Sequence, residues 1–271
     1  MGLFGKKEDP EDLMYQAMTF LEKNQPKAAV SLLKKVTKID PENVNAWYNQ
    51  GLALNQLKKY PDAITCFDII VQMNPNDASA LNNRAIAMAE LGDPEGAMEY
   101  YEKAIKVDPS YAPAYYNKGV LLDKKLEHGE ALKVLDEAIK IDPKKSNPRF
   151  YKGIVLGKTG KHELALNCFE NVYRANPKHL DSLFHKGIEL AELDRHEKAI
   201  DVFDKILDKH KGNINVVYAK ARSKAALNEV NEAFDLLNIA IKHSKTIKLW
   251  ARKEKVFEKF YDDPEFQRMV K

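Results

Sequence analysis

Apolar residues along Val44–Asp77 recur at the spacing of an α-helix. The first group is Trp47, Gly51 and Leu54, and the second is Ala63, Phe67 and Ile70. Within each group the residues stand three or four apart, so each group lies on one face of a helix. The two groups therefore predict two helices joined by a short connection.

The connection and the far end of this segment carry signals that start and stop helices. Pro61 suits the first turn of a new helix, where a missing N–H costs nothing, and Pro75 cannot continue a helix. Gly51 and Ala63 are small, which lets the two helix backbones approach closely. The segment is therefore predicted to fold as helix, tight turn, helix and break.

The same unit recurs with a period of 34 residues. Alanine keeps this register at Ala29, Ala63, Ala97, Ala131, Ala165, Ala199 and Ala233. Asp-Pro or Asn-Pro recurs at 40–41, 74–75, 108–109, 142–143 and 176–177. The junctions between helices carry residue types that tolerate the left-handed conformation, at Asn24, Gly92, Gly160, Asp194 and Asn228. Seven ungapped repeats are predicted, at 10–43, 44–77, 78–111, 112–145, 146–179, 180–213 and 214–247.

One such hairpin cannot bury both of its faces, so the repeats are expected to stack into a solenoid. The period and the residues Trp47-x2-Gln50-Gly51-x2-Leu54, Ala63-x3-Phe67 and Pro75 resemble the tetratricopeptide repeat. The resemblance covers 10–247 and implies an all-α fold, a right-handed α-α superhelical solenoid of seven helix hairpins. We expect a flexible N-terminal tail over 1–9. We expect a C-terminal capping helix over 248–271, whose apolar residues are Leu249, Trp250, Val256, Phe257 and Phe260.

Composition removes several classes of protein. Hydrophobic residues make up 44% and the net charge is +3, which excludes disorder as the dominant state. No stretch approaches the ~20 apolar residues of a transmembrane helix, so no membrane insertion is expected. Two cysteines cannot form a disulfide framework, and a cytoplasmic location is expected. Leu3 and Phe4 beside Lys6 and Lys7 leave contact of the tail with a membrane surface as an alternative.

Catalytic and metal-binding patterns are not found. The chain has no P-loop, GxSxG, HExxH or paired CxxC motif. His128, His162 and His196 recur once per repeat, but helices in adjacent repeats lie at least ~8–10 Å apart, too far to share one zinc ion. Cys66 and Cys168 are interpreted as core residues. We predict no enzyme activity, no metal and no cofactor.

The resemblance implies that the first helix of each repeat lines the concave side of the superhelix. Position 6 of the repeat holds Asn49, Asn83 and Asn117. An asparagine amide both donates and accepts hydrogen bonds, which suits the backbone of an extended peptide, although asparagine is also common there in the family. The carboxylate clamp of chaperone-docking members is not expected. The matching positions here are Met14, Met18, Asn49, Ser79 and Asn83, and only asparagine agrees with the clamp.

Position 9 is apolar in six successive repeats and position 5 is mostly aromatic. The position-9 residues are Met18, Leu52, Ile86, Val120, Ile154 and Ile188. The aromatic residues at position 5 are Tyr48, Tyr116, Phe150, Phe184 and Tyr218. A contiguous apolar stripe marks a binding surface if it is exposed. The alternative is that the stripe packs between neighbouring first helices.

The partner is expected to be a protein. The groove positions carry six acidic and three basic residues, so nucleic acid is not expected, because phosphate contacts need a basic track. We predict a non-catalytic protein–protein interaction scaffold that binds a peptide or helix segment with apolar anchors, neutral or basic in charge. The alternative is a structural or assembly subunit that uses its convex face or its C-terminal helix. The oligomeric state is not predicted.

Overall fold

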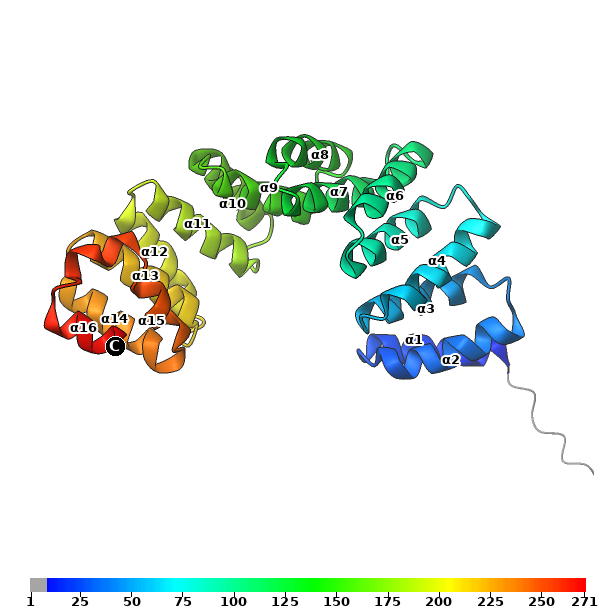
Figure 1. Cartoon of the computed structure of the whole chain (residues 1–271), viewed down its shortest axis with the longest axis horizontal. Coiled ribbons are helices and arrows are strands. Elements are labelled where there is room, and N and C mark those ends of the chain that lie inside the picture. The colour runs from blue at the N-terminus through cyan, green and yellow to red at the C-terminus, as the bar shows by residue number, and fades with distance from the viewer. Residues whose placement is uncertain (1–8) are drawn as a thin grey trace, which may run out of the picture. The chain divides into compact units, whose positions relative to one another are not determined.

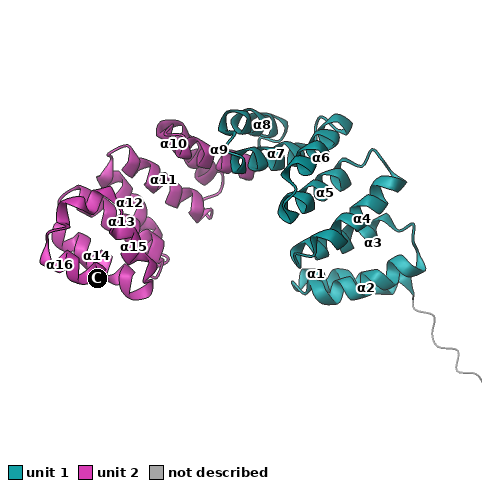
Figure 2. Ribbon diagram, viewed as in Figure 1, with its two compact units in different colours: residues 1–143 teal, residues 144–271 magenta. Residues whose placement is uncertain are grey.

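The computed structural model describes residues 9–271, and every regular element in that range is a helix (Figure 1). Most of the predicted N-terminal tail, residues 1–8, lies outside the described residues. The chain divides into two compact units, residues 1–143 and 144–271 (Figure 2). Between residues 9 and 271 no helix combines the length and the apolar character that crossing a bilayer needs.

The first unit consists of helix hairpins in which each helix packs against the next. Its helices are α1 (Pro10–Glu22), α2 (Pro26–Ile39), α3 (Val44–Gln56), α4 (Tyr60–Met73), α5 (Ala78–Leu91), α6 (Pro94–Val107), α7 (Ala112–Lys124) and α8 (His128–Ile141). The first helices of the hairpins are α1, α3, α5 and α7, and the second helices are α2, α4, α6 and α8. The predicted all-α arrangement of stacked, paired helices is confirmed.

The second unit continues the same pattern and ends in shorter elements. Its hairpin helices are α9 (Ser146–Lys158), α10 (His162–Ala175), α11 (Leu180–Glu192), α12 (His196–Leu207), α13 (Ile214–Ala226) and α14 (Val230–His243). The shorter elements are α15 (Thr246–Ala251), the 3-10 helix η1 (Lys255–Phe260) and α16 (Pro264–Val270). Residues 248–271 thus form short pieces instead of one continuous helix, since Pro264 fits only the first turn of a new helix.

Local sequence starts the helices at these places. Asn43, Asp77 and Asn213 precede first helices, and the side-chain oxygen of each accepts a hydrogen bond from a backbone N–H three residues later. Such caps satisfy donors that the first turn leaves unpaired. Pro61 lies in the first turn of α4, and α4 ends at Met73, shortly before Pro75. The predicted roles of both prolines are confirmed.

The turn inside each hairpin has one backbone conformation. The predicted residues Asn24, Gly92, Gly160, Asp194 and Asn228 all have a positive φ. Lys58 and Leu126, at the equivalent places in two other hairpins, also have positive φ values, of 58° and 64°. The stacking of the hairpins therefore imposes the left-handed turn even where the residue type disfavours it.

The core lies between the two helices of each hairpin and between neighbouring hairpins. All seven alanines of the register have 0% exposure. Phe67, Phe169 and Phe203 on second helices are also fully buried, and each ring packs on a glycine of the first helix, at Gly51, Gly153 and Gly187. The first helices are thereby held with one face against the core and another face away from it.

The C-terminal pieces complete the core of the second unit. Ile247, Ala251, Phe257 and Phe266 are buried in one cluster with residues of α13 and α14 such as Leu237. The aromatic rings of this cluster lie close together, with 5.7 Å between the centroids of Phe257 and Phe266. This packing supports the expected capping role of the segment, which stays a prediction.

Candidate functional site

The apolar residues at position 9 lie on the first helices, and none of their side chains is fully buried. Leu52 is 36% exposed, and the side chains of Met18, Ile86, Val120, Ile154 and Ile188 are partly buried. Ile86 and Ile188 border the buried clusters of their own units. These side chains thus keep part of their surface exposed, and their role in binding stays a prediction.

In the first unit, three of the predicted binding residues line one small hollow. Ile86 on α5 and Asn117 and Val120 on α7 surround about 120 Å³ of space. At its edge, Lys124 Nζ lies 3.1 Å from Glu90 Oε1. The hollow therefore combines apolar walls, one amide and a charge pair that is already balanced.

The three asparagines at position 6 differ in what their amides contact. Asn83 is only 8% exposed, and its Nδ2 donates to Tyr48 Oη at 3.0 Å and to the carbonyl of Ser79 at 2.8 Å. Asn49 Nδ2 donates to the carbonyl of Asn45 at 2.8 Å, whereas Asn117 Nδ2 donates across to Asn82 Oδ1 at 2.9 Å. These contacts use amide N–H groups that were expected to bind a peptide. Binding of a peptide by Asn49, Asn83 and Asn117 stays a prediction.

Three of the aromatic residues at position 5 pack against the phenylalanines of the second helices. The ring of Tyr48 meets Phe67 edge-on at 6.1 Å, Phe150 meets Phe169 at 5.5 Å, and Phe184 lies 6.2 Å from Phe203. Tyr218 is 7% exposed, and burial raises the pKa of both Tyr218 and Tyr116. These side chains therefore contribute to the core as well as to the first-helix face.

A larger cavity lies in the second unit. It has a volume of about 610 Å³ and lies among α11, α13 and the segment around η1. Ile188 and Phe203 contribute to its apolar wall, together with Val256 of the C-terminal segment. The predicted residue Ile188 thus lines this cavity, whereas the contribution of residues 254–259 was not predicted.

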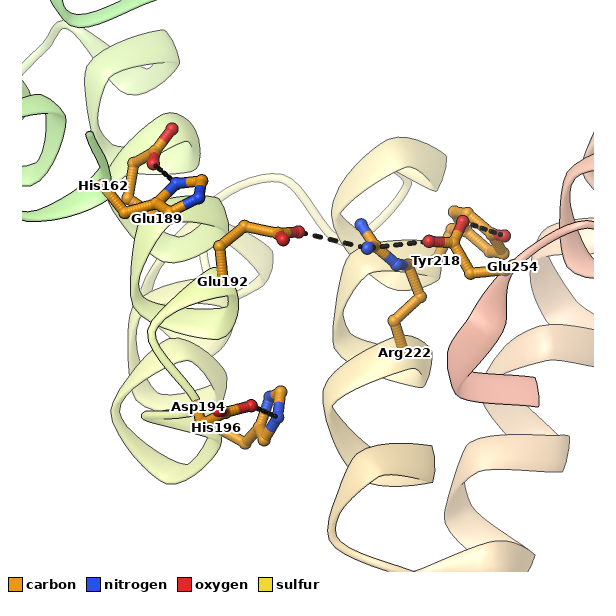
Figure 3. A network of polar contacts seen from close by, with 8 residues as sticks. All are labelled: His162, Glu189, Glu192, Asp194, His196, Tyr218, Arg222 and Glu254. Carbon is orange, nitrogen blue, oxygen red and sulfur yellow. Dashed lines mark hydrogen bonds and ion pairs between the residues drawn. The ribbon is translucent and has the colours of Figure 1, made fainter. Parts of the chain in front are cut away.

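Figure 3 shows the polar network at this cavity. Arg222 on α13 lies between two carboxylates, and its Nη2 is 3.3 Å from Glu192 Oε1 and 2.8 Å from Glu254 Oε1. Tyr218 Oη donates to Glu254 Oε2 at 3.3 Å. Glu192 and Arg222 stand at groove positions in the repeat. Glu254 follows the last repeat, so the period of 34 residues could not predict its part in this network.

The three periodic histidines each lie near a carboxylate. His128 Nδ1 is 3.0 Å from Asp123 Oδ1, and His162 Nδ1 is 2.8 Å from Glu189 Oε2. His196 Nε2 lies 3.7 Å from Asp194 Oδ1. Burial raises the pKa of Glu189, and the hydrogen bond with His162 partly opposes this shift. Each pair joins two neighbouring helices or closes a turn.

Three models of the family described as "Tetratricopeptide repeat" match the chain, at residues 53–116, 88–153 and 152–214. The chain belongs to the tetratricopeptide repeat family. A further model, "Anaphase-promoting complex, cyclosome, subunit 3", matches residues 3–70. No curated protein matches the chain.

Solved structures of other proteins share the fold. YrrB, described as a protein with an unusual peptide-binding site, is 24% identical with a TM-score of 0.59, over 69% of this chain and 97% of YrrB. A tetratricopeptide repeat protein from Parabacteroides merdae ATCC 43184 is 19% identical with a TM-score of 0.63, over 88% and 96%. PilW, a type IV pilus biogenesis factor, is 20% identical with a TM-score of 0.67, over 77% and 96%.

Tetratricopeptide repeat proteins generally mediate protein–protein interactions and are typically non-catalytic. Among residues 9–271 of this member, no three His, Cys, Asp or Glu side chains are grouped so that they could hold a metal ion. Cys66 is buried, its Sγ accepts a hydrogen bond from Gln50 Nε2, and burial raises its pKa to about 11. Its thiol therefore stays protonated at neutral pH, which is unsuited to a nucleophile.

Proposed function

We propose that this tetratricopeptide repeat protein is a non-catalytic scaffold whose first-helix face binds a peptide or helical segment of a partner protein. The observation that carries the proposal is the hollow lined by Ile86, Asn117 and Val120. Side chains that are already partly ordered lose little conformational entropy when a ligand covers them. The peptide-binding site described for YrrB supports the same use of the fold.

The ligand is expected to carry apolar anchors. Partly exposed Leu52, Ile86 and Val120 recur on successive first helices of the first unit, so they favour a segment with apolar side chains at intervals. The neighbouring pair of Lys124 and Glu90 is balanced in charge, and the hollow therefore does not select an acidic ligand. A neutral or basic segment is expected, since the groove positions carry six acidic and three basic residues.

The test is binding of a displayed peptide library to the wild-type chain and to the double variant Ile86→Ser, Val120→Ser. The wild type is expected to select peptides with apolar anchors, and the double variant should bind them at least ~10-fold more weakly, because buried apolar anchors carry much of the energy of an interface. The matched control is Ile39→Ser. Ile39 is 43% exposed on α2, so that variant should bind like the wild type.

One observation favours the assembly-subunit alternative. Leu249 and Trp250 are 56% and 47% exposed on α15, a degree of exposure that suits an interface with another protein. If the double variant keeps its fold and binds like the wild type, while Trp250→Ala abolishes association with a partner, the first-helix proposal is wrong and this alternative replaces it.

A further inference from the structure

The cavity in the second unit is built by two repeats and by the C-terminal segment together. Glu192 on α11, Arg222 and Ser223 on α13, and Glu254 and Val256 beside η1 all line it. Its volume of about 610 Å³ is within the range of ligand-binding pockets. The C-terminal segment therefore contributes both packing and part of a polar site.

The charges of this cavity favour a cation. One guanidinium, that of Arg222, is shared by the carboxylates of Glu192 and Glu254 (Figure 3), so this group of three carries one excess negative charge. In total four carboxylates and three cationic side chains line the cavity. One of the cations, Lys259, donates to Asn228 Oδ1 in the turn between α13 and α14. Glu192, with a side chain that is 41% exposed, can still accept from a ligand.

Unpaired polar atoms in the same place indicate a ligand with hydrogen-bonding groups of its own. Ser223 has 0% exposure, and its Oγ has no hydrogen-bond partner among the described residues. Arg222 Nε, a donor, is also buried without a partner in that range. Buried polar groups in folded proteins are rarely left unpaired. A peptide supplies both a carbonyl acceptor for Arg222 and an N–H donor for Ser223, with a small local adjustment, whereas a small amine supplies no acceptor.

We propose that this cavity binds a lysine or arginine side chain of the partner's peptide segment. The aliphatic part of that side chain lies along Ile188 and Val256, and its cationic group lies beside Glu192 and Glu254. The adjoining main-chain groups pair with Arg222 Nε and Ser223 Oγ. Aspartate or glutamate is rejected at this position, because it would meet two carboxylates. The inference rests on the proposed function, and it specifies the charge of the ligand in the second unit.

The experiment is a positional-scanning hexapeptide library bound to the full chain. At one position, lysine and arginine should be preferred over norleucine, which has a similar stem and no charge, by about tenfold, as one charge-assisted hydrogen bond provides. In the double variant Glu192→Gln, Glu254→Gln this preference should fall to about twofold, because neutral amides lose the charge-assisted part of the contact. Asp201→Asn on the exposed side of α12 is the matched control and should keep the full preference.

The outcomes separate this inference from the proposed function. Peptides selected without any preference for a basic residue overturn the inference and leave the proposed function standing. If the wild type selects no peptide, the proposed function fails and the inference fails with it. If Asp201→Asn loses the preference for lysine and arginine to the same extent, the preference depends on net charge and the proposed site is wrong. Complete displacement of the peptide by spermidine identifies a small-amine site and overturns the peptide assignment.

A variant that unfolds is recognised by its thermal melting curve. Glu192→Gln alone is then compared, since Glu192 is the more exposed of the two carboxylates. Wild-type affinity is also measured for the lysine and norleucine peptides at rising salt. Only the affinity for the lysine peptide should fall, because salt screens exposed charges. An equal fall in affinity for the two peptides would contradict the proposed site.

Discussion

The ring of Phe67 fills the place beside Gly51 where a side chain would have to stand. A Cβ atom added to Gly51 would lie 2.7 Å from Phe67 Cζ, closer than non-bonded carbon atoms normally approach. The same relationship joins Gly153 to Phe169 and Gly187 to Phe203. The aromatic ring thereby sets the distance between the two helices of a hairpin.

Gly51→Ala is therefore expected to destabilise the protein. The added methyl group must displace the buried ring of Phe67, and such overpacking typically costs about 1–3 kcal/mol. The control is Gly129→Ala in the first turn of α8, where an added Cβ meets nothing within 4 Å, so no packing cost is expected. Urea denaturation of both variants measures the difference. Equal effects of the two substitutions would contradict the role given to Phe67.

Leu126→Asn is expected to stabilise the chain. Leu126 has a φ of 64° and is 77% exposed, so it bears the strain of a left-handed residue and contributes little burial. The left-handed conformation costs an ordinary residue about 1–2 kcal/mol, and asparagine tolerates it better, so a gain of up to about 1 kcal/mol is expected. Calorimetry on Leu164→Asn provides the comparison. Leu164 is exposed within α10, where asparagine is a poorer helix former, and a gain there as large as at Leu126 would refute the explanation.

The repeated parts of the fold were predictable because local residues determine them. Asn24, Asp194 and Asn228 tolerate a positive φ, and the fixed spacing of alanines such as Ala63 identified the buried face. Lys58 was not predicted as a left-handed residue, since only its place in the register, and not its type, indicates that conformation.

The candidate site was less predictable, because it depends on the directions of side chains. Nothing in the position of Asn83 indicates that its amide donates to Tyr48 and Ser79. Glu254 follows the last repeat and meets Arg222, which lies 32 residues earlier in the sequence, so no repeat pattern relates the two. Contacts of this kind require the three-dimensional packing of the C-terminal segment.

Phe257→Ala tests the capping role of that segment. Phe257 has 0% exposure within the last core cluster, so removal of its ring should cost about 3–5 kcal/mol and expose apolar surface of α13 and α14. Leu249→Ala, at a residue that is 56% exposed, should change stability by less than ~0.5 kcal/mol. Thermal melting and light scattering measure stability and self-association. An unchanged melting temperature and a clean monomer for Phe257→Ala would assign the segment to docking instead.

His185 should make the second unit sensitive to acid. Its ring lies among Phe150, Phe169 and Phe184, and burial lowers its pKa in the folded state, with Asp181 partly opposing the shift. Above the unfolded pKa of ~6.5 both states are neutral. As the pH falls below that value, the unfolded state binds a proton first, so the free energy of unfolding declines until the folded pKa is reached.

The measurement is urea denaturation between about pH 4 and pH 8 for the wild type and for His185→Gln. As the pH falls through this window, the wild type should lose more unfolding free energy than His185→Gln. His243→Asn, at an exposed histidine of α14, is the matched control, because it removes a histidine without disturbing the aromatic cluster around His185. Parallel curves for the wild type and His185→Gln would show that burial of His185 has no thermodynamic effect.

Residues of five types, among them lysine and leucine, share the left-handed turn conformation at Asn24, Lys58, Gly92, Leu126, Gly160, Asp194 and Asn228. A single residue inserted into a helix would rotate everything after it in that helix by ~100°, and an alanine such as Ala63, which has no exposed surface, would face water. Viable changes of length in this gene are therefore expected to copy or delete whole modules of 34 codons, while single substitutions at the turns keep the module length and cost only the strain of one left-handed residue.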